Sequence, residues 1–344
     1  MSYYVDNYME SLYKKNQIKY DINEIHNDNY LYDFTVGMHK EFVKCLGEMP
    51  KSLPLDVVVL KETQCKGYKR LKIEYTVDEN LRAPAYILIP DNIKKENAAV
   101  IALAGHGYGV ADIVGLTENG EEKPEGGDPG YQKNFAVELV KRGFIVAAPE
   151  LFGFGELMLS PNENHRRDGS SCFMLSTQFF MYGKTMAGMR VWQAERMFEY
   201  LLERGDIDPD RIGSMGISGG GLVSSFFAAY EQRVAAFVVS GYFCTFKDSI
   251  MSIYHCIDNF VPGILKNGEM VDLFGLLAPS ALLIEAGTDD NIFPIEAVKS
   301  SYKKLENLYK RLNAEDSLEI DIFKGEHQIS GARAYDFLAK WLLK

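Results

Sequence analysis

Three stretches between residues 57 and 89 have the apolar and polar pattern that is typical of β-strands. Apolar side chains alternate with polar ones or form short runs in Val57–Leu60, Lys69–Val77 and Ala83–Ile89. A period of two places alternate side chains on opposite faces of a sheet. Because short connections join these stretches, we expect antiparallel strands at one edge of a sheet.

After Pro90 the pattern changes to continuous apolar runs that alternate with amphipathic segments. The expected strands are Ala98–Ala104, Phe144–Ala148, Arg211–Ile217, Val234–Ser240, Ala281–Ala286 and Leu318–Phe323. The expected helices are Tyr131–Lys141, Thr185–Glu203, Gly219–Tyr230, Ile295–Leu312 and Gly331–Leu343. Strands of continuous apolar character are covered on both faces. The pattern therefore predicts one α/β domain with a mostly parallel central sheet between two helical layers.

The remaining segments are an N-terminal extension and two long connections. Residues 1–50 are rich in Tyr and Asn, and we expect a helical extension that packs on the main domain, 51–344, or forms a subunit contact. The connections 152–184 and 242–280 follow the carboxyl ends of strands, where open α/β sheets bind ligands. Insertions of this length usually carry function or helices of their own, so we expect lid or pocket-wall segments.

Composition excludes several classes of partner. The 344 residues have a net charge of −11, without a cluster of basic residues that could follow a phosphate backbone, so neither nucleic acid nor an anionic membrane is an expected partner. The start of the chain lacks the basic and apolar regions of a secretion signal, and no segment has the ~18 apolar residues of a membrane span. We therefore expect a cytoplasmic protein.

The cysteines are an odd and scattered set without C-x-x-C spacing. They are Cys45, Cys65, Cys172, Cys244 and Cys256. This pattern suits a reducing compartment and argues against a disulfide framework or a zinc site. We expect all five to be small buried side chains, and we expect no metal and no cofactor.

One glycine-rich turn has the pattern of a catalytic nucleophile. It lies between an expected strand and an expected helix and reads Gly216-Ile217-Ser218-Gly219-Gly220. In the G-x-S-x-G elbow a sharp turn projects the serine hydroxyl out of the sheet, and a Cβ at the flanking glycines would collide with the crossing backbone. A serine in such a turn is often an ordinary turn residue, but its place midway through an α/β pattern favours Ser218 as the nucleophile.

A general base and an acid follow Ser218 at the expected positions. His327 alone among the six histidines follows the last strand and precedes the last helix. We expect His26, His39, His165 and His255 to be surface or pocket-wall residues. The acid follows the penultimate strand, where either Asp289 or Asp290 would serve; we favour Asp290, four residues before Pro294. A buried carboxylate fixes the tautomer of the base and stabilises its charged form.

Two backbone amides are candidates for stabilising an oxyanion. Gly219 follows the nucleophile, and Tyr108 lies in the loop after the first parallel strand, Gly105-His106-Gly107-Tyr108-Gly109. We expect His106 to brace this loop or to contact substrate. The loop lacks the G-x-G-x-x-G spacing of nucleotide-binding loops.

These motifs resemble those of the α/β-hydrolase superfamily, and within it the bacterial dienelactone-hydrolase-like and acetyl-xylan-esterase-like serine esterases. The matching segments are Ala104–Gly107, Asp208–Ile212, the elbow at Ser218, Gly287–Pro294 and Gly325–His327. Three features depart from that pattern: Ser218 stands where dienelactone hydrolases have a cysteine, Gln328 follows the histidine where relatives often have Glu, and no Arg-Gly-Gln motif lies near the oxyanion loop.

The resemblance implies an α/β-hydrolase fold and a Ser-His-Asp triad that cleaves carboxylic esters through an acyl-enzyme. We expect a small-molecule ester with a short acyl group as substrate, and a homo-oligomer is compatible with the sequence. Tyr242 and Phe243 are candidate substrate contacts, although burial in the core explains them equally well. Arg166, Arg167 and Asp168 could bind a charged substrate group, but we favour a solvated loop there. The alternatives are a peptidase or amidase of the prolyl-oligopeptidase kind and a non-catalytic binding protein. The first normally carries a much longer N-terminal portion, and the second would be expected to have a broken triad.

Overall fold

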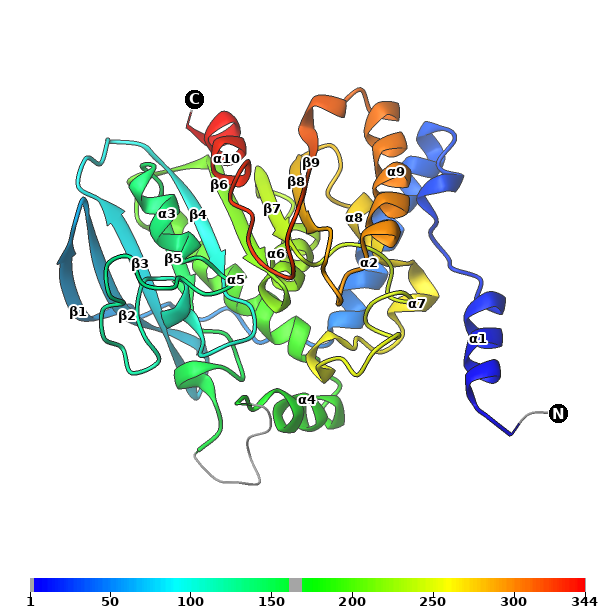
Figure 1. Ribbon diagram of the computed structural model, residues 1–344, viewed down its shortest axis with the longest axis horizontal. Coiled ribbons are helices and arrows are strands. Elements are labelled where there is room, and N and C mark those ends of the chain that lie inside the picture. Colours follow the sequence, from blue (N-terminus) through cyan, green and yellow to red (C-terminus); the bar gives the residue numbers. More distant parts are fainter. Residues whose placement is uncertain (1–2, 161–168, 344) are drawn as a thin grey trace.

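The computed structural model describes residues 3–160 and 169–343, and in this part of the chain nine strands form one continuous sheet (Figure 1). Their order across the sheet is β1-β2-β3-β5-β4-β6-β7-β8-β9. The strands are β1 Val58–Cys65, β2 Tyr68–Asp78, β3 Leu81–Pro90, β4 Asn97–Leu103, β5 Ile145–Pro149, β6 Ile207–Ile217, β7 Ala236–Ser240, β8 Ala281–Gly287 and β9 Leu318–Phe323.

The sheet has an antiparallel edge and a parallel remainder, as the hydrophobic pattern predicts. Strands β1, β2 and β3 pair antiparallel, and β3 also pairs antiparallel with β5. From β5 through β4, β6, β7 and β8 to β9 every pairing is parallel. The carboxyl ends of these parallel strands therefore meet at one edge of the sheet, where ligand sites of open α/β sheets are found.

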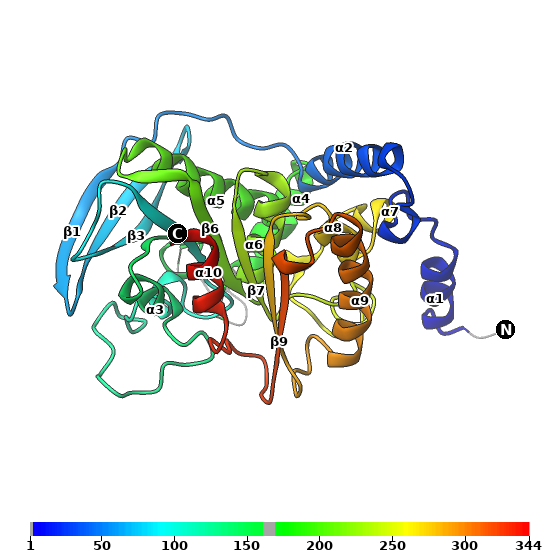
Figure 2. The ribbon, with the colours of Figure 1, turned by 90° about the horizontal axis from the view of Figure 1, so that it is seen from above.

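Helices cover both faces of the sheet, and Figure 2 shows α3 and α10 on the opposite side from α2 and α5. The helices are α1 Asp6–Lys15, α2 Asp28–Leu46, α3 Phe135–Lys141, α4 Cys172–Met181, α5 Met186–Glu203, α6 Gly219–Tyr230, α7 Ile264–Asn267, α8 Met270–Gly275, α9 Ile295–Arg311 and α10 Ala334–Leu342. Each face has its own apolar core, one shared with α3 and α10 and the other with α2, α5, α6, α8 and α9. The predicted two-layer covering of the sheet is confirmed.

Two of the predicted helices begin later than expected. Helix α3 starts at Phe135 rather than Tyr131 because Lys133 and Asn134 have φ of 49° and 47°, which a right-handed helix does not allow. Helix α10 starts at Ala334 because Gly331 has φ of 69°. Both changes leave irregular backbone near the site described below.

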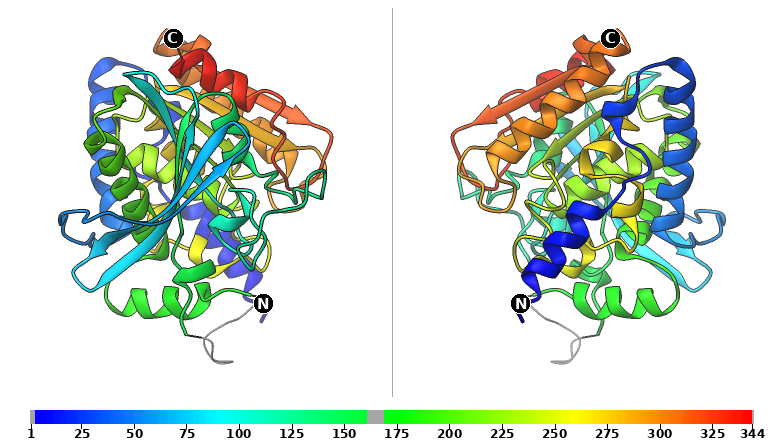
Figure 3. Two further views of the ribbon diagram at one scale, coloured as in Figure 1. Left: turned by 90° about the vertical axis from the view of Figure 1, so that its left-hand side faces the viewer. Right: turned by 90° about the vertical axis from the view of Figure 1, so that its right-hand side faces the viewer.

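The N-terminal segment and the two long connections carry short helices of their own. Helix α2 packs on the core through Phe42, whose ring lies 5.2 Å edge-on from that of Phe226 in α6. The connection before α5 contains α4, which both views of Figure 3 show (in green) at one end of the molecule. The connection after β7 contains α7, α8 and the 3-10 helix η4, Ile257–Asn259. No helix within the described ranges is long and apolar enough to cross a membrane.

Candidate active site

Ser218 occupies a sharp turn between β6 and α6. It is the single residue between the end of the strand at Ile217 and the start of the helix at Gly219, and its φ of 56° and ψ of −123° lie outside the regions that most residues adopt. A Cβ at Gly216 would lie 2.1 Å from the carbonyl oxygen of Gly220, and a Cβ at Gly220 would lie 2.0 Å from that of Leu103. The two glycines are therefore required by backbone contacts, as the motif predicts.

The parallel register brings the end of β6 beside the loop that carries His327. Ile217 lies opposite Ser240 at the end of β7, and the amide of Ser218 donates to the Ser240 carbonyl over 2.9 Å. The chain then turns at Gly241, which has φ of 52°. A Cβ at Gly241 would lie 2.8 Å from Cε1 of His327, so the imidazole lies directly against this turn.

His327 and Asp290 form a close pair. Nδ1 of the imidazole lies 2.7 Å from Oδ2 of Asp290, while Oδ1 accepts hydrogen bonds from the amides of Ile292 at 2.8 Å and Phe293 at 3.1 Å. Nε2 of His327 is buried, and no atom in the described ranges is a hydrogen-bond partner for it. This arrangement fixes the ring and leaves one nitrogen available to exchange a proton.

Asp289, the alternative acid, has a different environment. Its side chain is 42% exposed and pairs with Lys324 at 2.6 Å on the surface. The geometry therefore distinguishes the two carboxylates, and only Asp290 is in contact with the imidazole of His327.

The loop after β4 lies against the elbow. A Cβ at Gly105 would lie 3.3 Å from Cβ of Ser218. Buried side chains hold the loop in place: Gln132 Oε1 accepts from the Gly105 amide at 2.7 Å, and Glu150 Oε1 accepts from the Val110 amide at 2.9 Å. The amide of Tyr108 has no acceptor among residues 3–160 and 169–343, and its hydroxyl donates to the Leu116 carbonyl over 3.1 Å.

The amide of Gly219 also has no acceptor among the residues that the structure describes, for a different reason. As the first residue of α6 it has no intrahelical acceptor, and the positive end of the helix dipole lies at this amide. The amides of Gly219 and Tyr108 are thus both available at the end of the sheet that carries Ser218.

His106 belongs to an ion-pair network rather than to the His327 pair. Its Nε2 lies 3.1 Å from Oδ2 of Asp258, which also accepts from Nη1 of Arg190 at 2.6 Å. Burial disfavours the charged ring, but the Asp258 carboxylate outweighs this and raises the pKa of His106 to about 10. The other edge of the ring lies against the elbow, since a Cβ at Gly219 would be 3.0 Å from Nδ1. The predicted bracing role of His106 is consistent with these contacts.

Two cavities meet at His106. The larger, of about 800 Å³, lies on the Tyr108 side and has a mixed lining that includes Lys72, Glu150 and Glu156. The smaller, of about 570 Å³, lies between α4 and the segment 253–260 and has a mostly apolar lining. The two long connections thus form cavity walls next to the loop after β4.

Tyr242 and Phe243 are core residues, which argues against their candidacy as substrate contacts. Each is 1% exposed, and neither lines either of the two cavities. Tyr242 packs on Phe293 with 5.3 Å between ring centroids, and Phe243 packs on Phe274 at 4.7 Å. The turn at Gly241 directs the chain back into the core. The other candidates in this region, His165, Arg166, Arg167 and Asp168, lie outside the described residues.

Comparisons with known proteins agree with this architecture. Residues 5–310 match a model described as the Abhydrolase family. The chain belongs to this Abhydrolase family. It is 27% identical to a Bacillus subtilis (strain 168) protein named "Putative hydrolase YtaP". The alignment extends over 315 residues and covers 88% of this chain and 98% of that protein.

Two solved structures show that this member of the Abhydrolase family has the α/β-hydrolase fold. A structure described as a "putative acetyl xylan esterase" from Bacteroides fragilis NCTC 9343 superposes with a TM-score of 0.79, at 17% identity, over 94% of this chain and 83% of that one. A glucuronoyl esterase from Solibacter usitatus superposes with a TM-score of 0.66, at 13% identity, over 91% of this chain and 93% of that one. The family match ends at residue 310, before His327, so the assignment of His327 depends on the geometry of this chain.

The structure adds site residues of this Abhydrolase member that the sequence analysis missed. Glu285 lies in the middle of an apolar strand and accepts hydrogen bonds from Ser240 and Gly331; a lone charge in an apolar run was the available signal. The ring of His327 stacks with those of Tyr131 and Phe293, which have no distinguishing sequence pattern. Cys172 and Cys256 lie together beside His106, so the argument from missing C-x-x-C spacing does not exclude a metal site.

Proposed function

We propose that this chain is a serine esterase in which Ser218, His327 and Asp290 form the catalytic triad. The observation that carries the proposal is the 2.7 Å contact between His327 Nδ1 and Asp290 Oδ2, at a ring whose Nε2 is buried without a partner in the described chain. The strained backbone of Ser218 at a strand-to-helix turn supports its role as the nucleophile. Chain order Ser, Asp, His is that of α/β hydrolases.

The proposed reaction has two steps. His327 Nε2 accepts the proton of the Ser218 hydroxyl while Oγ attacks the ester carbonyl, and the amides of Gly219 and Tyr108 stabilise the oxyanion of the tetrahedral intermediate. The carbon–oxygen bond to the alcohol breaks, and His327 donates its proton to the departing oxygen. Water then attacks the acyl-enzyme with His327 again as base, which releases the acid and restores Ser218.

We propose a short acyl group on a polar alcohol as the substrate. The larger cavity has charged side chains in its wall, including Lys72 and Glu156, which suits a polar alcohol portion. Solved structures of similar fold are described as a putative acetyl xylan esterase and a glucuronoyl esterase, and these names are compatible with a polar alcohol portion. An amidase remains the alternative within the hydrolases, because it needs the same triad.

The test is hydrolysis of p-nitrophenyl esters from acetate to octanoate by wild type, Ser218→Ala and Ser225→Ala. Ser225 is a buried serine of the same helix whose hydroxyl donates to the Leu222 carbonyl, so it controls for helix damage. We expect highest turnover on the short esters, a loss of roughly 10⁴- to 10⁶-fold in Ser218→Ala, and little change in Ser225→Ala. A matched p-nitroanilide separates an amidase from an esterase. Equal inactivity of all three proteins, with no labelling of Ser218 by a fluorophosphonate, would exclude the proposal and favour a binding protein.

A further inference from the structure

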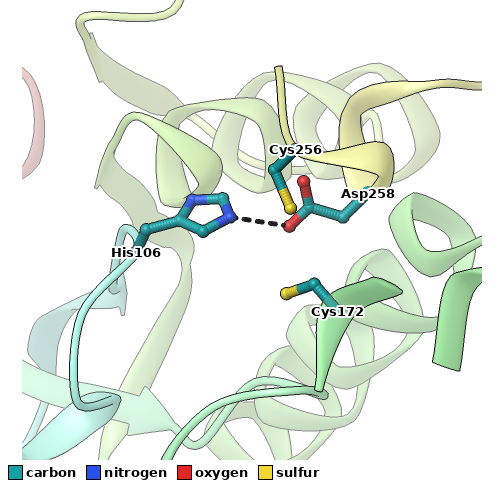
Figure 4. Close-up of side chains that lie close together, drawn as sticks. All are labelled: His106, Cys172, Cys256 and Asp258. Carbon is teal, nitrogen blue, oxygen red and sulfur yellow. Dashed lines mark ion pairs between the residues drawn. The ribbon is translucent and has the colours of Figure 1, made fainter. Parts of the chain in front are cut away.

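Four side chains from three distant segments converge next to the oxyanion loop (Figure 4). His106 comes from the loop after β4, Cys172 from the first residue of α4, and Cys256 and Asp258 from the segment that forms η4. One nitrogen, two sulfur and one oxygen atom lie within 4.8 Å of one another. In Figure 4 these atoms point toward a common centre.

We propose that His106, Cys172, Cys256 and Asp258 bind one Zn²⁺ ion. Two thiolates, an imidazole and a carboxylate are a donor set that Zn²⁺ accepts in tetrahedral geometry. Bonds of about 2.0–2.1 Å to nitrogen and oxygen at a tetrahedral angle imply an N···O separation of about 3.4 Å. The His106 Nε2 and Asp258 Oδ2 atoms are 3.1 Å apart, so only small movements would be needed to complete this edge.

The Nε2 atom of His106 supplies independent support for a ligand. It is buried, and its contact with Asp258 does not have hydrogen-bond geometry, so it has no hydrogen-bond partner among the described residues. Nε2 is ion-paired with Asp258 at 3.1 Å, but this pair leaves its hydrogen-bonding direction unsatisfied, and an ion or another group would satisfy it. An ion at the centre of the four side chains would do so.

The surroundings of the four side chains orient them as metal ligands are usually oriented. Nδ2 of Asn259 donates to Asp258 Oδ1 at 2.7 Å, and Nη2 of Arg190 donates to Cys172 Sγ at 3.1 Å. In metal sites, hydrogen-bond partners of this kind hold the coordinating side chains in the orientation that the metal ion requires. Arg190 also makes the charges balance: two thiolates and one carboxylate give −3, and Zn²⁺ with the guanidinium gives +3. A buried cluster of zero net charge avoids the cost of an uncompensated charge.

Four protein ligands leave no open position on a tetrahedral ion, so we assign the site a structural role. It would join the loop of His106, which carries the Tyr108 amide, to α4 and η4. The smaller cavity reaches His106, Cys172 and Cys256 and offers a path for the ion. This inference does not depend on the proposed esterase activity, because Ser218 is not among the ligands.

The test measures zinc in the full chain purified under reducing conditions and passed through gel filtration. We expect about one zinc per chain by mass spectrometry of the metal. After chelation, reloading with Co²⁺ should give the intense visible bands of a tetrahedral site and a thiolate-to-cobalt charge-transfer band. Chelation of wild type also tests the site without any substitution that could prevent folding.

Matched variants separate the site from unspecific binding. Cys172→Ser and the less buried Cys256→Ser should each lower zinc affinity by at least about 100-fold, whereas Cys65→Ser and Ser218→Ala should retain zinc. Zinc at the same low level in wild type and in Cys256→Ser, or a weak octahedral cobalt spectrum, would overturn the proposal. A Cys172–Cys256 disulfide in protein isolated without reductant, together with failure of the reduced protein to bind either metal, would identify a redox pair instead.

Discussion

The ring of Tyr131 lies parallel to the imidazole of His327, with 6.0 Å between ring centroids and 22° between planes. The hydroxyl of the same tyrosine donates to the carbonyl of His106 over 2.5 Å. One side chain therefore contacts both the proposed base and the loop that carries the proposed oxyanion amide. This relationship couples the positions of two parts of the site that lie far apart in the sequence.

Tyr131→Phe should lower kcat while changing KM little. The substitution retains the stacked ring but removes a hydrogen bond worth about 0.5–1.5 kcal/mol, so we expect a loss of about 2- to 13-fold in kcat. Tyr309→Phe is a matched control, because that buried hydroxyl donates to the Ser280 carbonyl at 2.9 Å away from the site. Both variants should lose similar stability in thermal melts. Equal kcat in the two variants would show that Tyr131 has no positioning role.

The two neighbouring aspartates provide a second test. Asp290→Asn removes the acceptor that orients His327, and loss of this acceptor in a triad costs about 10⁴-fold in kcat. Asp289→Asn removes only a surface ion pair with Lys324 and should change kcat by no more than about twofold. The measurement is steady-state hydrolysis of p-nitrophenyl acetate. Comparable losses in both variants would contradict the assignment of Asp290.

Glu150 should make the protein less stable as the pH rises. Burial raises the pKa of its carboxyl to about 7 in the folded chain, from 4.5. The folded state therefore holds a proton that the unfolded chain releases between about pH 4.5 and 7, and the free energy of unfolding falls as pH rises through this window. Across the whole window the free energy of unfolding should fall by roughly 3 kcal/mol, since each pKa unit corresponds to about 1.4 kcal/mol.

Urea unfolding at pH 5 and pH 8 measures this effect. From pH 5 to pH 8 the free energy of unfolding of wild type should fall by up to roughly 3 kcal/mol more than that of Glu150→Gln, because the variant cannot titrate at this position. The constant cost of replacing an oxygen that accepts from Val110 or Glu156 cancels in the comparison. Glu296→Gln, at an 82% exposed side chain, should follow wild type. Parallel pH dependence of wild type and Glu150→Gln would contradict the prediction.

The hydrophobic pattern and the glycine spacing predicted the regular parts of this fold because these parts depend on residues close together in the sequence. Period-two alternation located the antiparallel edge, and the glycines around Ser218 located the elbow because contacts at 2.0–2.1 Å exclude any Cβ there. Position relative to the last strands selected His327 and Asp290. These inferences needed only the order of elements along the chain.

Side-chain placement beyond the strand ends depends on how irregular backbone folds, and the sequence did not predict it. The sequence left open whether Tyr242 and Phe243 line a pocket or the core, and the turn at Gly241 directs them into the core. Cys172 and Cys256 meet only because α4 packs against η4. Tyr131 reaches His106 because α3 begins late and leaves it in a loop.

Glu285 should hold the loop of His327 in place, so its removal should cost both stability and turnover. Its Oε2 accepts from the Ser240 hydroxyl at 2.6 Å and the Ser330 amide at 3.3 Å, and its Oε1 accepts from the Gly331 amide at 2.9 Å. Glu285→Ala leaves buried donors without acceptors at about 1–3 kcal/mol each, and the loosened loop should lower kcat at least about tenfold. Glu285→Gln keeps one acceptor oxygen and should recover part of both losses. Glu319→Ala removes an ion pair with Arg333 from the edge strand β9 and should change stability and kcat only slightly. The measurements are thermal melts and steady-state kinetics of wild type and the three variants. A large loss of stability in Glu285→Ala with unchanged kcat would mean that Glu285 supports the sheet without positioning His327.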